Sequence, residues 1–321
     1  MSIKNKKVAI ITGVTSFLGR STAKYLLEKG FIVFGIVRPD SDISKLSNLK
    51  SNNDESLSGS NFHIIKLDFN SLSSNDFINI SDNSIDNQQS IQLINNIKDL
   101  KADISLIHFA WGSTLDRSNF AKQMMNIDMS SKVLEFAKII GAKRFIFAGS
   151  QAEKSESAYG IAKKEFSNMA ISDLKNNEMK FIHFRIFSIY GKEDRETSLL
   201  KQLVKSFREN KDITLSSCEY KWNFLYIDDF TYIVYKFISK NVDTGTYDIA
   251  SFDTRLLKDY VIEAHDAYGA KNKLLFGKRP DSLESFAIPD IKNTINAIGN
   301  MKFTKFSDGI LKISEPLKSF V

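Results

Sequence analysis

The segment Val8–Gly19 reads VAIITGVTSFLG, and the helical pattern Ser21–Lys29 follows it and ends at Gly30. The continuous apolar run Val8–Thr12 is typical of a parallel strand buried on both faces. Glycine in the turn after such a strand permits close approach of a pyrophosphate, whose charge the free amides at the helix start bind. Ser16 stands where the usual pattern has its middle glycine. The segment predicts the first strand and helix of a dinucleotide-binding α/β domain.

Strand and helix patterns alternate beyond this segment. We expect a helix at 91–100, from its helical apolar spacing, and a longer one at 119–141, which ends at Gly141 where a C-cap glycine is favoured. Because βαβ units repeat, the sheet should be parallel and doubly wound, as in a Rossmann-type fold. The further strands that we expect are 31–37, 62–67, 104–112, 144–150 and 179–187.

Composition excludes several classes of protein. The 321 residues are 42% hydrophobic, with 44 basic and 38 acidic side chains that give a formal charge of +6. This small excess, spread without a long basic run, argues against nucleic-acid binding. Cys218 is the sole cysteine, so an intramolecular disulfide is impossible and a zinc site is not expected. The first residues contain no signal-peptide or membrane-span pattern, and we expect a cytoplasmic protein that does not enter the membrane.

The segment Arg144–Ser150 predicts a buried strand that delivers the Ser150 hydroxyl to its carboxyl end. Tyr159 and Lys163 follow, four residues apart, which places both side chains on one face of a helix. A phenol with a reference pKa of about 10 transfers protons poorly at neutral pH, but a neighbouring ammonium favours the phenolate. Taken alone, the Tyr-x-x-x-Lys spacing is a weak signal and favours a surface pair on an ordinary helix. With the rest of the chain, it predicts a proton-transfer centre.

Cofactor choice depends on the end of the second strand, where Val37 precedes Arg38. An acidic residue there would bind the ribose 2′-hydroxyl of NAD, whereas a guanidinium suits a 2′-phosphate. We therefore expect NADP(H) in preference to NAD(H). Asp68, at the end of the third strand, is placed to reach the adenine, and His108 is expected to pack at a strand end. Asp228 and Asp229 favour a helix start over a metal site, and we expect no metal.

In order and spacing, these segments resemble the extended short-chain dehydrogenase/reductase family, in its nucleotide-sugar-modifying epimerase/dehydratase branch. The resemblance covers residues 6–250. It is carried by Thr12–Gly19, Asp68, His108–Trp111, Asn126, Phe147–Ser150, Tyr159, Lys163, Arg185, Tyr190–Gly191 and Leu225–Asp229.

This resemblance implies a Rossmann domain over residues 1–187, completed by about 224–250, and a smaller mixed α/β substrate domain from 188–223 and 251–321. It implies NAD(P) along the sheet, a nucleotide-sugar substrate, and a homodimer that packs helices 119–141 and 158–178. The implied cofactor-binding residues are Gly13, Thr15, Ser16, Phe17, Leu18, Gly19, Arg38, Asp68, Phe109, Ala110, Trp111, Asn126, Tyr159 and Lys163. The implied substrate-binding residues are Trp111, Ser150, Gln151, Arg185 and Trp222.

In the implied mechanism Ser150 binds the substrate oxygen, Tyr159 transfers the proton, and Lys163 holds the nicotinamide ribose. Dehydratases of this branch carry an acidic residue two positions after the catalytic Ser or Thr, where this chain has Ala152, and Glu153 cannot be assumed to substitute for it. The segment between Ser150 and Tyr159 is also shorter than is usual in the branch, which leaves the substrate open.

We therefore expect an NADPH-dependent reductase of a 4-keto nucleotide sugar, with Tyr159 as the proton donor. A nucleotide-sugar epimerase, or a sugar alcohol dehydrogenase, with retained NAD(P) is the alternative. A non-catalytic NADP-binding regulator remains as a third possibility.

Overall fold

The computed structural model describes residues 7–49, 61–72, 88–100, 102–281 and 287–314. The chain divides into two compact units: Met1–Arg185 with Val234–Tyr247, and Ile186–Ile233 with Asp248–Val321. Parts of the predicted substrate domain, 282–286 and 315–321, lie outside the described residues.

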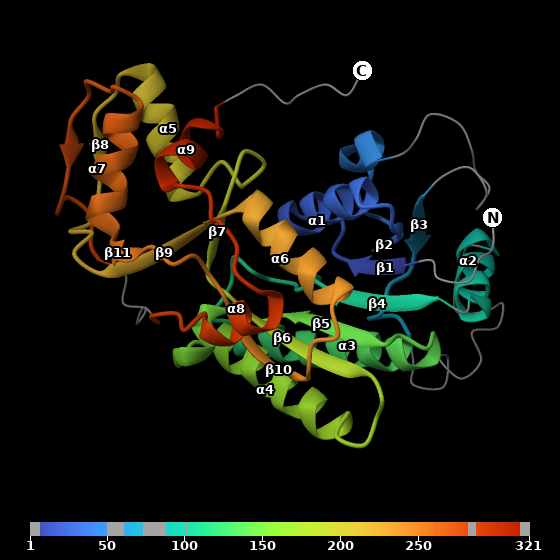
Figure 1. The fold of residues 1–321 in the computed structure, drawn as a ribbon. Coiled ribbons are helices and arrows are strands. Elements are labelled where there is room, and N and C mark those ends of the chain that lie inside the picture. The colour runs from blue at the N-terminus through green and yellow to red at the C-terminus, as the bar shows by residue number, and fades with distance from the viewer. Residues whose placement is uncertain (1–6, 50–60, 73–87, 101, 282–286, 315–321) are drawn as a thin grey trace. The chain divides into compact units, whose positions relative to one another are not determined.

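A seven-stranded sheet dominates the first unit, in the order β10-β6-β5-β4-β1-β2-β3 (Figure 1). Its pairing is parallel from β6 through β3, as the repeated βαβ pattern predicted. The fold is therefore the Rossmann-type α/β fold expected from the sequence. The strands are β1 (Lys7–Thr12), β2 (Ile32–Val37), β3 (Phe62–Lys66), β4 (Asp103–His108), β5 (Arg144–Ala148), β6 (Lys180–Ile186) and β10 (Gly245–Ile249).

Helices cover both faces of this sheet. Helix α1 (Phe17–Glu28) lies on one face, while α2 (Gln88–Asp99), α3 (Phe120–Ile139) and α4 (Ala158–Asp173) share one core on the other (Figure 1). Burying a large apolar side chain in such a core stabilises the fold by about 1.5–3 kcal/mol. Its aromatic centre, with Phe147 and Phe166 rings 4.7 Å apart, is Phe145, Phe147, Phe166 and Phe181.

Several element ends differ from the sequence prediction, among them those of α1, β5 and α4. Helix α1 begins at Phe17 because the Ser16 side chain accepts a hydrogen bond from the Gly19 amide and caps the helix. Strand β5 ends at Ala148 because Ser150 caps a following 3₁₀ turn, η2 (Gln151–Lys154). Helix α4 ends at Asp173, short of the predicted residue 178, and turns lead from it into β6.

The second unit has smaller sheets and short helices around an aromatic core. Phe224 and Tyr260 are 5.0 Å apart between ring centroids, and Tyr260 and Phe306 are 4.7 Å apart. One sheet has the order β11-β9-β7, and a second pairs β12 with β8. The elements are β7 (Ser188–Tyr190), α5 (Leu199–Glu209), β8 (Ile213–Thr214), β9 (Lys221–Tyr226), β11 (Thr254–Leu256), α7 (Leu257–Ala267), β12 (Leu274–Leu275), α8 (Lys292–Ile298) and α9 (Phe306–Leu311); α6 (Ile227–Ser239) contributes to both units.

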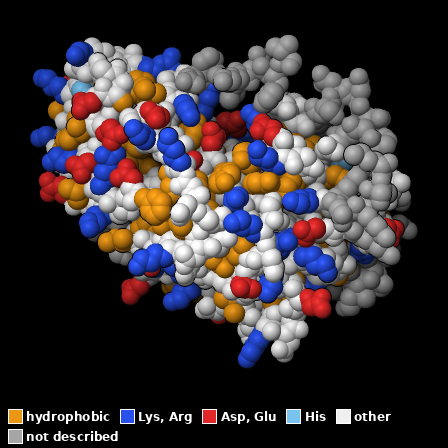
Figure 2. Space-filling model, in the orientation of Figure 1, with side chains coloured by type: hydrophobic (Ala, Val, Ile, Leu, Met, Phe, Trp, Pro, Cys, Tyr) orange, Lys and Arg blue, Asp and Glu red, His pale blue; other side chains and the backbone are white. Residues whose placement is uncertain are grey.

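Charge is mixed on the visible surface. Figure 2 shows basic and acidic side chains interspersed over the displayed face, with apolar side chains between them. Such mixing is typical of a surface without a concentrated basic patch. Among the described helices, none combines the length and the hydropathy needed to cross a bilayer.

Candidate active site

The carboxyl ends of the central strands bring the predicted site residues to one edge of the sheet. Thr12 of β1 pairs in register with His108 of β4, and His108 pairs with Phe147 of β5. The glycine turn after β1, the loop after β4 and the turn after β5 therefore start side by side. In parallel α/β sheets this edge is where ligands bind.

The glycine turn after β1 packs against the loop after β4. Gly13 has a φ of +69°, and a Cβ atom there would lie 2.8 Å from the backbone nitrogen of Ala110. A Cβ atom on Gly19 would overlap the Gly13 carbonyl oxygen. Both positions thus require glycine. The other predicted residues of the turn, Thr15, Ser16, Phe17 and Leu18, are partly buried or exposed at the start of α1.

The predicted determinants of cofactor choice lie on the neighbouring strands. Arg38 follows β2 and is exposed, with its Nε 3.6 Å from Asp40 Oδ1. Asp68 follows β3 and accepts hydrogen bonds from the backbone and side-chain nitrogens of Asn70. Because β2 pairs with β1 on one side and with β3 on the other, these residues and the glycine turn share one sheet edge.

Two polar side chains of α3 hold the loop after β4. Asn126 Oδ1 accepts from the Gly112 amide at 2.6 Å, and its Nδ2 donates to the Gly112 carbonyl at 3.2 Å. Gln123 is fully buried; its Oε1 accepts from Trp111 Nε1 at 2.9 Å, and its Nε2 donates to the Ser113 carbonyl. The family resemblance predicts Asn126 as a cofactor-binding residue, whereas nothing in the sequence distinguishes Gln123.

Lys163 lies at the centre of the site. Its Nζ donates to the Ala148 carbonyl at 2.5 Å and lies 4.1 Å from the centre of the Trp111 ring system. Burial lowers the pKa of Lys163 to about 7, an effect that nearby Glu153 opposes and Arg117 reinforces. The structure thus holds this lysine at the carboxyl end of β5.

Tyr159 stands one turn before Lys163 on α4 and is buried. The Lys163 ammonium lies 5.6 Å from its ring centroid, and the Trp111 ring meets it edge-on at 6.2 Å. The Arg117 guanidinium carbon lies 4.9 Å from the same centroid. The Tyr159 ring is therefore surrounded by two cationic side chains, Lys163 and Arg117, and by the Trp111 indole.

Ser150 begins the turn between β5 and α4. Its Oγ accepts from the Ala152 amide at 3.2 Å, while its own amide donates to Glu153 Oε1 at 2.7 Å. This capping box folds the short segment before Tyr159 into η2. A Cβ atom on Gly160 would overlap the Ala152 carbonyl, so η2 packs directly on α4.

Glu153 is buried in a polar network behind η2. Its Oε1 lies 3.0 Å from His183 Nε2, and its Oε2 lies 3.7 Å from Arg185 Nε. His183 Nδ1 in turn lies 3.1 Å from both Ser167 Oγ and Thr246 Oγ1. The Glu153 side chain is only 3% exposed, so its carboxylate is buried in the protein interior. Arg185, predicted to bind substrate, is directed toward this network.

His108 packs at the end of β4, as expected. Its Nδ1 lies 2.7 Å from Thr12 Oγ1, and its Nε2 lies 2.9 Å from Ser130 Oγ. Complete burial lowers the pKa of His108 to about 3, which keeps the imidazole neutral. His108 is thus a structural link between β1, β4 and α3.

Gln151 and Trp222 are the two remaining residues predicted to bind substrate. Gln151 is the first residue of η2, directly after Ser150. Trp222 lies on β9 in the second unit, where its ring contacts those of Tyr220 and Phe224. The sequence predicted a strand over 104–112 that included Phe109 and Ala110, but β4 ends at His108 and these two residues begin the loop after it.

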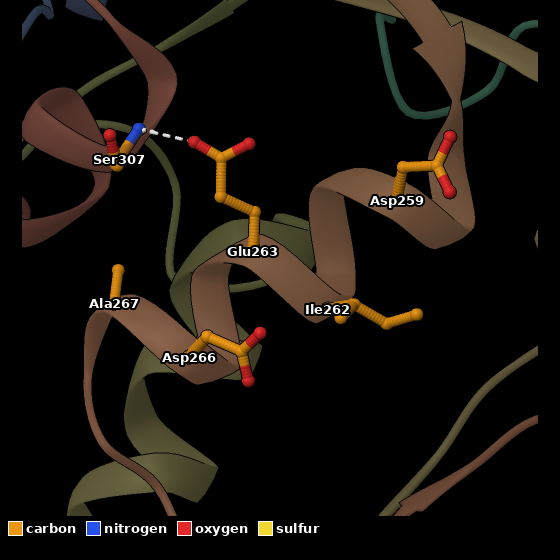
Figure 3. A pocket seen from close by; sticks show the side chains of 6 residues that line it. All are labelled: Asp259, Ile262, Glu263, Asp266, Ala267 and Ser307. Atoms are coloured by element: carbon orange, nitrogen blue, oxygen red, sulfur yellow. Dashed lines mark hydrogen bonds between the residues drawn. The ribbon is translucent and has the colours of Figure 1, made fainter.

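An acidic hollow of about 350 Å³ lies on α7 in the second unit (Figure 3). Asp259, Glu263 and Asp266 line it, and Glu263 accepts a hydrogen bond from the Ser307 amide at 3.0 Å. In the described part of the chain, no group of three or more His, Cys, Asp or Glu residues is arranged to hold a metal ion. Asp229, in the first turn of α6, accepts from the Thr304 amide at 2.8 Å.

The parallel sheet, the glycine turn and the Tyr-Lys pair define an extended short-chain dehydrogenase/reductase. Residues 9–250 match the model of the NAD dependent epimerase/dehydratase family. The chain belongs to that family and is an NAD(P)-dependent enzyme.

Known relatives are distant in sequence. CDP-abequose synthase of Salmonella muenchen is 22% identical over 253 residues, covering 76% of this chain and 74% of the synthase. UDP-glucose 4-epimerase of Thermotoga maritima, solved with UDP-glucose, superposes with a TM-score of 0.74 at 15% identity, covering 96% and 97% of the two chains. UDP-glucuronic acid 4-epimerase of Bacillus cereus, solved with NAD, gives 0.68 at 20% identity, covering 95% and 96%. These structures share the fold.

Proposed function

We propose that the protein is an NADPH-dependent reductase of a 4-keto nucleotide sugar. The main support for this proposal is the arrangement of Tyr159 and Lys163 at the sheet edge. In addition, no acidic side chain is available at the position of the dehydratase acid. Ala152 occupies that position, and Glu153 is engaged with His183 and the Ser150 amide. Proton transfer by Tyr159 is thus supported, while protonation of a departing hydroxyl is not.

Each side chain has a role that its contacts permit. The Ser150 hydroxyl accepts from the Ala152 amide, which leaves its proton free to donate to the substrate ketone. Tyr159 gives its phenolic proton to the ketone oxygen, and Lys163 binds the nicotinamide ribose and stabilises the phenolate that remains. A bound NADPH supplies the hydride for the carbonyl carbon.

NADP(H) is proposed over NAD(H) because of Arg38. This guanidinium is exposed at the end of β2, where the adenosine ribose of a cofactor on this sheet edge would lie. Its pairing with Asp40 is a surface ion pair, which a phosphate can replace at little cost. The Bacillus cereus relative was solved with NAD, so cofactor preference needs its own measurement.

The test follows NADPH absorbance with CDP-, UDP-, GDP- and dTDP-linked 4-keto-6-deoxy sugars, with NADH as the control. The name CDP-abequose synthase makes the CDP-linked sugar the first to try. Oxidation of NADPH with one sugar supports the proposal and identifies the nucleotide. Silence across the panel, in protein shown to bind NADPH, would overturn it.

A nucleotide-sugar 4-epimerase is the second candidate, favoured by the names of the structural relatives. Such an enzyme returns the hydride to the same substrate, so the cofactor stays bound and shows no net turnover. Recovery of tightly bound NAD(H) from purified protein, with interconversion of two nucleotide sugars, would select this candidate. A regulator without catalysis would leave every such assay silent and lose no function when Tyr159 is replaced by Phe.

We also propose a homodimer that packs α3 and α4. Both helices bury one face in the core and still expose large apolar side chains on the other. Phe120, Met125, Ile161 and Met169 are 58%, 65%, 43% and 45% exposed. The two helices pack against each other, and exposed apolar side chains gathered on adjacent elements are typical of protein interfaces.

A further inference from the structure

The loop Trp111–Arg117, which we name the covering loop, places one side chain on each member of the Tyr-Lys pair. Its first residue, Trp111, lies over the Lys163 ammonium, and its last, Arg117, lies over the Tyr159 ring at 4.9 Å. No sequence pattern drew attention to Arg117. The geometry gives the proton-transfer centre a second cation, from outside α4.

Backbone and side-chain hydrogen bonds hold Arg117 in this position. Its carbonyl accepts from the Tyr159 amide at 3.0 Å, and its Nε donates to the Thr114 carbonyl at 3.3 Å. Gln123 Nε2 donates to the Asp116 carbonyl at 3.0 Å, which fixes the preceding residue to α3. The guanidinium is therefore carried by an anchored loop.

The charged groups around the Tyr159 phenol differ in whether they keep their charge at neutral pH. Lys163, from α4, has its pKa lowered to about 7 by burial, so at neutral pH it is charged only part of the time. Glu153, from η2, is held by His183, and Asp116 of the covering loop pairs with Lys122 at 2.9 Å. A guanidinium stays protonated throughout the working range. Arg117 thus supplies the permanent positive charge next to the ring.

We propose that Arg117 is a positioning residue that favours the phenolate form of Tyr159, an inference that rests on the proposed reductase function. In the reaction, the O–H bond of Tyr159 breaks and an O–H bond forms on the ketone oxygen, while the hydride of NADPH forms the C–H bond at the carbonyl carbon. NADPH is oxidised and the ketone is reduced. The phenolate left behind carries the charge that Arg117 stabilises.

The first test needs no substrate. We would titrate ligand-free protein by the near-ultraviolet absorbance of tyrosinate and subtract the titration of Tyr159→Phe to isolate Tyr159. In Arg117→Met, which removes the charge and keeps the backbone contact, the midpoint should rise by about one pH unit or more. Arg117→Lys should restore most of the shift, and Lys24→Met, which removes one exposed basic charge on α1, should cause none. An unmoved midpoint in Arg117→Met would overturn the proposal.

The second test uses turnover and separates this inference from the function on which it rests. In NADPH oxidation, Tyr159 must be protonated, so kcat falls at alkaline pH as the phenol titrates. Loss of Arg117 should move that fall to higher pH, with KM for NADPH unchanged. If no keto sugar is reduced by the wild type, the proposed function fails, and the absorbance titration still decides the role of Arg117.

Discussion

The ammonium nitrogen of Lys163 lies 2.5 Å from the carbonyl oxygen of Ala148, the last residue of β5. One backbone acceptor therefore fixes the buried amine at the carboxyl edge of the sheet, one helical turn from Tyr159. The amine gives up solvation to occupy this site, since burial is the main cause of its lowered pKa.

Replacing Lys163 with Met should stabilise the protein while abolishing its activity. The pKa of Lys163 is about 7 in the folded state, against 10.5 for an unperturbed lysine, so the unfolded chain binds more protons between these pH values. Wild-type stability from this group thus rises with pH by about 1.4 kcal/mol per unit across that window. The gain in Lys163→Met should be largest below pH 7 and shrink toward pH 10.5. Urea unfolding at a series of pH values checks this; a gain independent of pH contradicts it.

Tyr159→Phe should retain the fold and the cofactor while losing turnover. The substitution removes only the phenolic oxygen, so the ring contacts with Trp111 and Arg117 remain. General acid catalysis contributes about 10²–10⁴-fold, and kcat should fall by that order. Cofactor binding, followed by fluorescence titration, should be unchanged. Turnover near the wild-type rate would remove Tyr159 from the mechanism.

Arg38→Ser should change the cofactor preference. Loss of a charged hydrogen bond to a 2′-phosphate costs about 1.5–3 kcal/mol, so KM for NADPH should rise by roughly tenfold to a hundredfold. KM for NADH should stay near its starting value. Lys24→Met, at an exposed position on α1, is the matched loss of one basic charge. Equal effects of Arg38→Ser on both cofactors would show that Arg38 does not select NADP.

Glu153→Ala should destabilise the protein and disorder η2. The change leaves the Ser150 amide and His183 without their buried acceptor, at a cost of about 1–3 kcal/mol for each unpaired group. Glu153→Gln keeps a side-chain acceptor for the Ser150 amide and should lose less. Thermal and urea unfolding rank the three proteins; equal stability of the Ala and Gln variants would argue against the network.

The sheet and the Tyr-Lys pair could be predicted because their signals are local. Buried parallel strands read as continuous apolar runs, and a spacing of four places two side chains on one helix face. The ends of the helices and strands were harder to predict because they depend on capping contacts. The early start of α1 depends on the Ser16 cap, and the end of β5 depends on the Ser150–Glu153 capping box.

The rest of the site depends on contacts between distant segments. Arg117 meets Tyr159 across 42 positions of sequence, and Gln123 meets Trp111 only because α3 folds back over the loop after β4. The sequence could not show whether Glu153 replaces the dehydratase acid. Its spacing from Ser150 does not give the direction in which its side chain points. Its partner His183 lies 30 residues further on, in β6.

The proposed dimer gives the last prediction. Met125 is 65% exposed on α3, and placing a charge there should cost little in the monomer but much inside an apolar interface. Met125→Glu should therefore lower the mass measured by sedimentation from that of two chains to that of one, with the unfolding curve of the isolated chain little changed. Ile262→Glu, at a position 41% exposed on α7, is the matched control and should leave the mass unchanged. A wild-type protein that sediments as one chain would exclude the dimer. A Met125→Glu variant that remains a dimer would place the interface elsewhere, since an apolar contact centred on α3 cannot accommodate a buried, unpaired carboxylate.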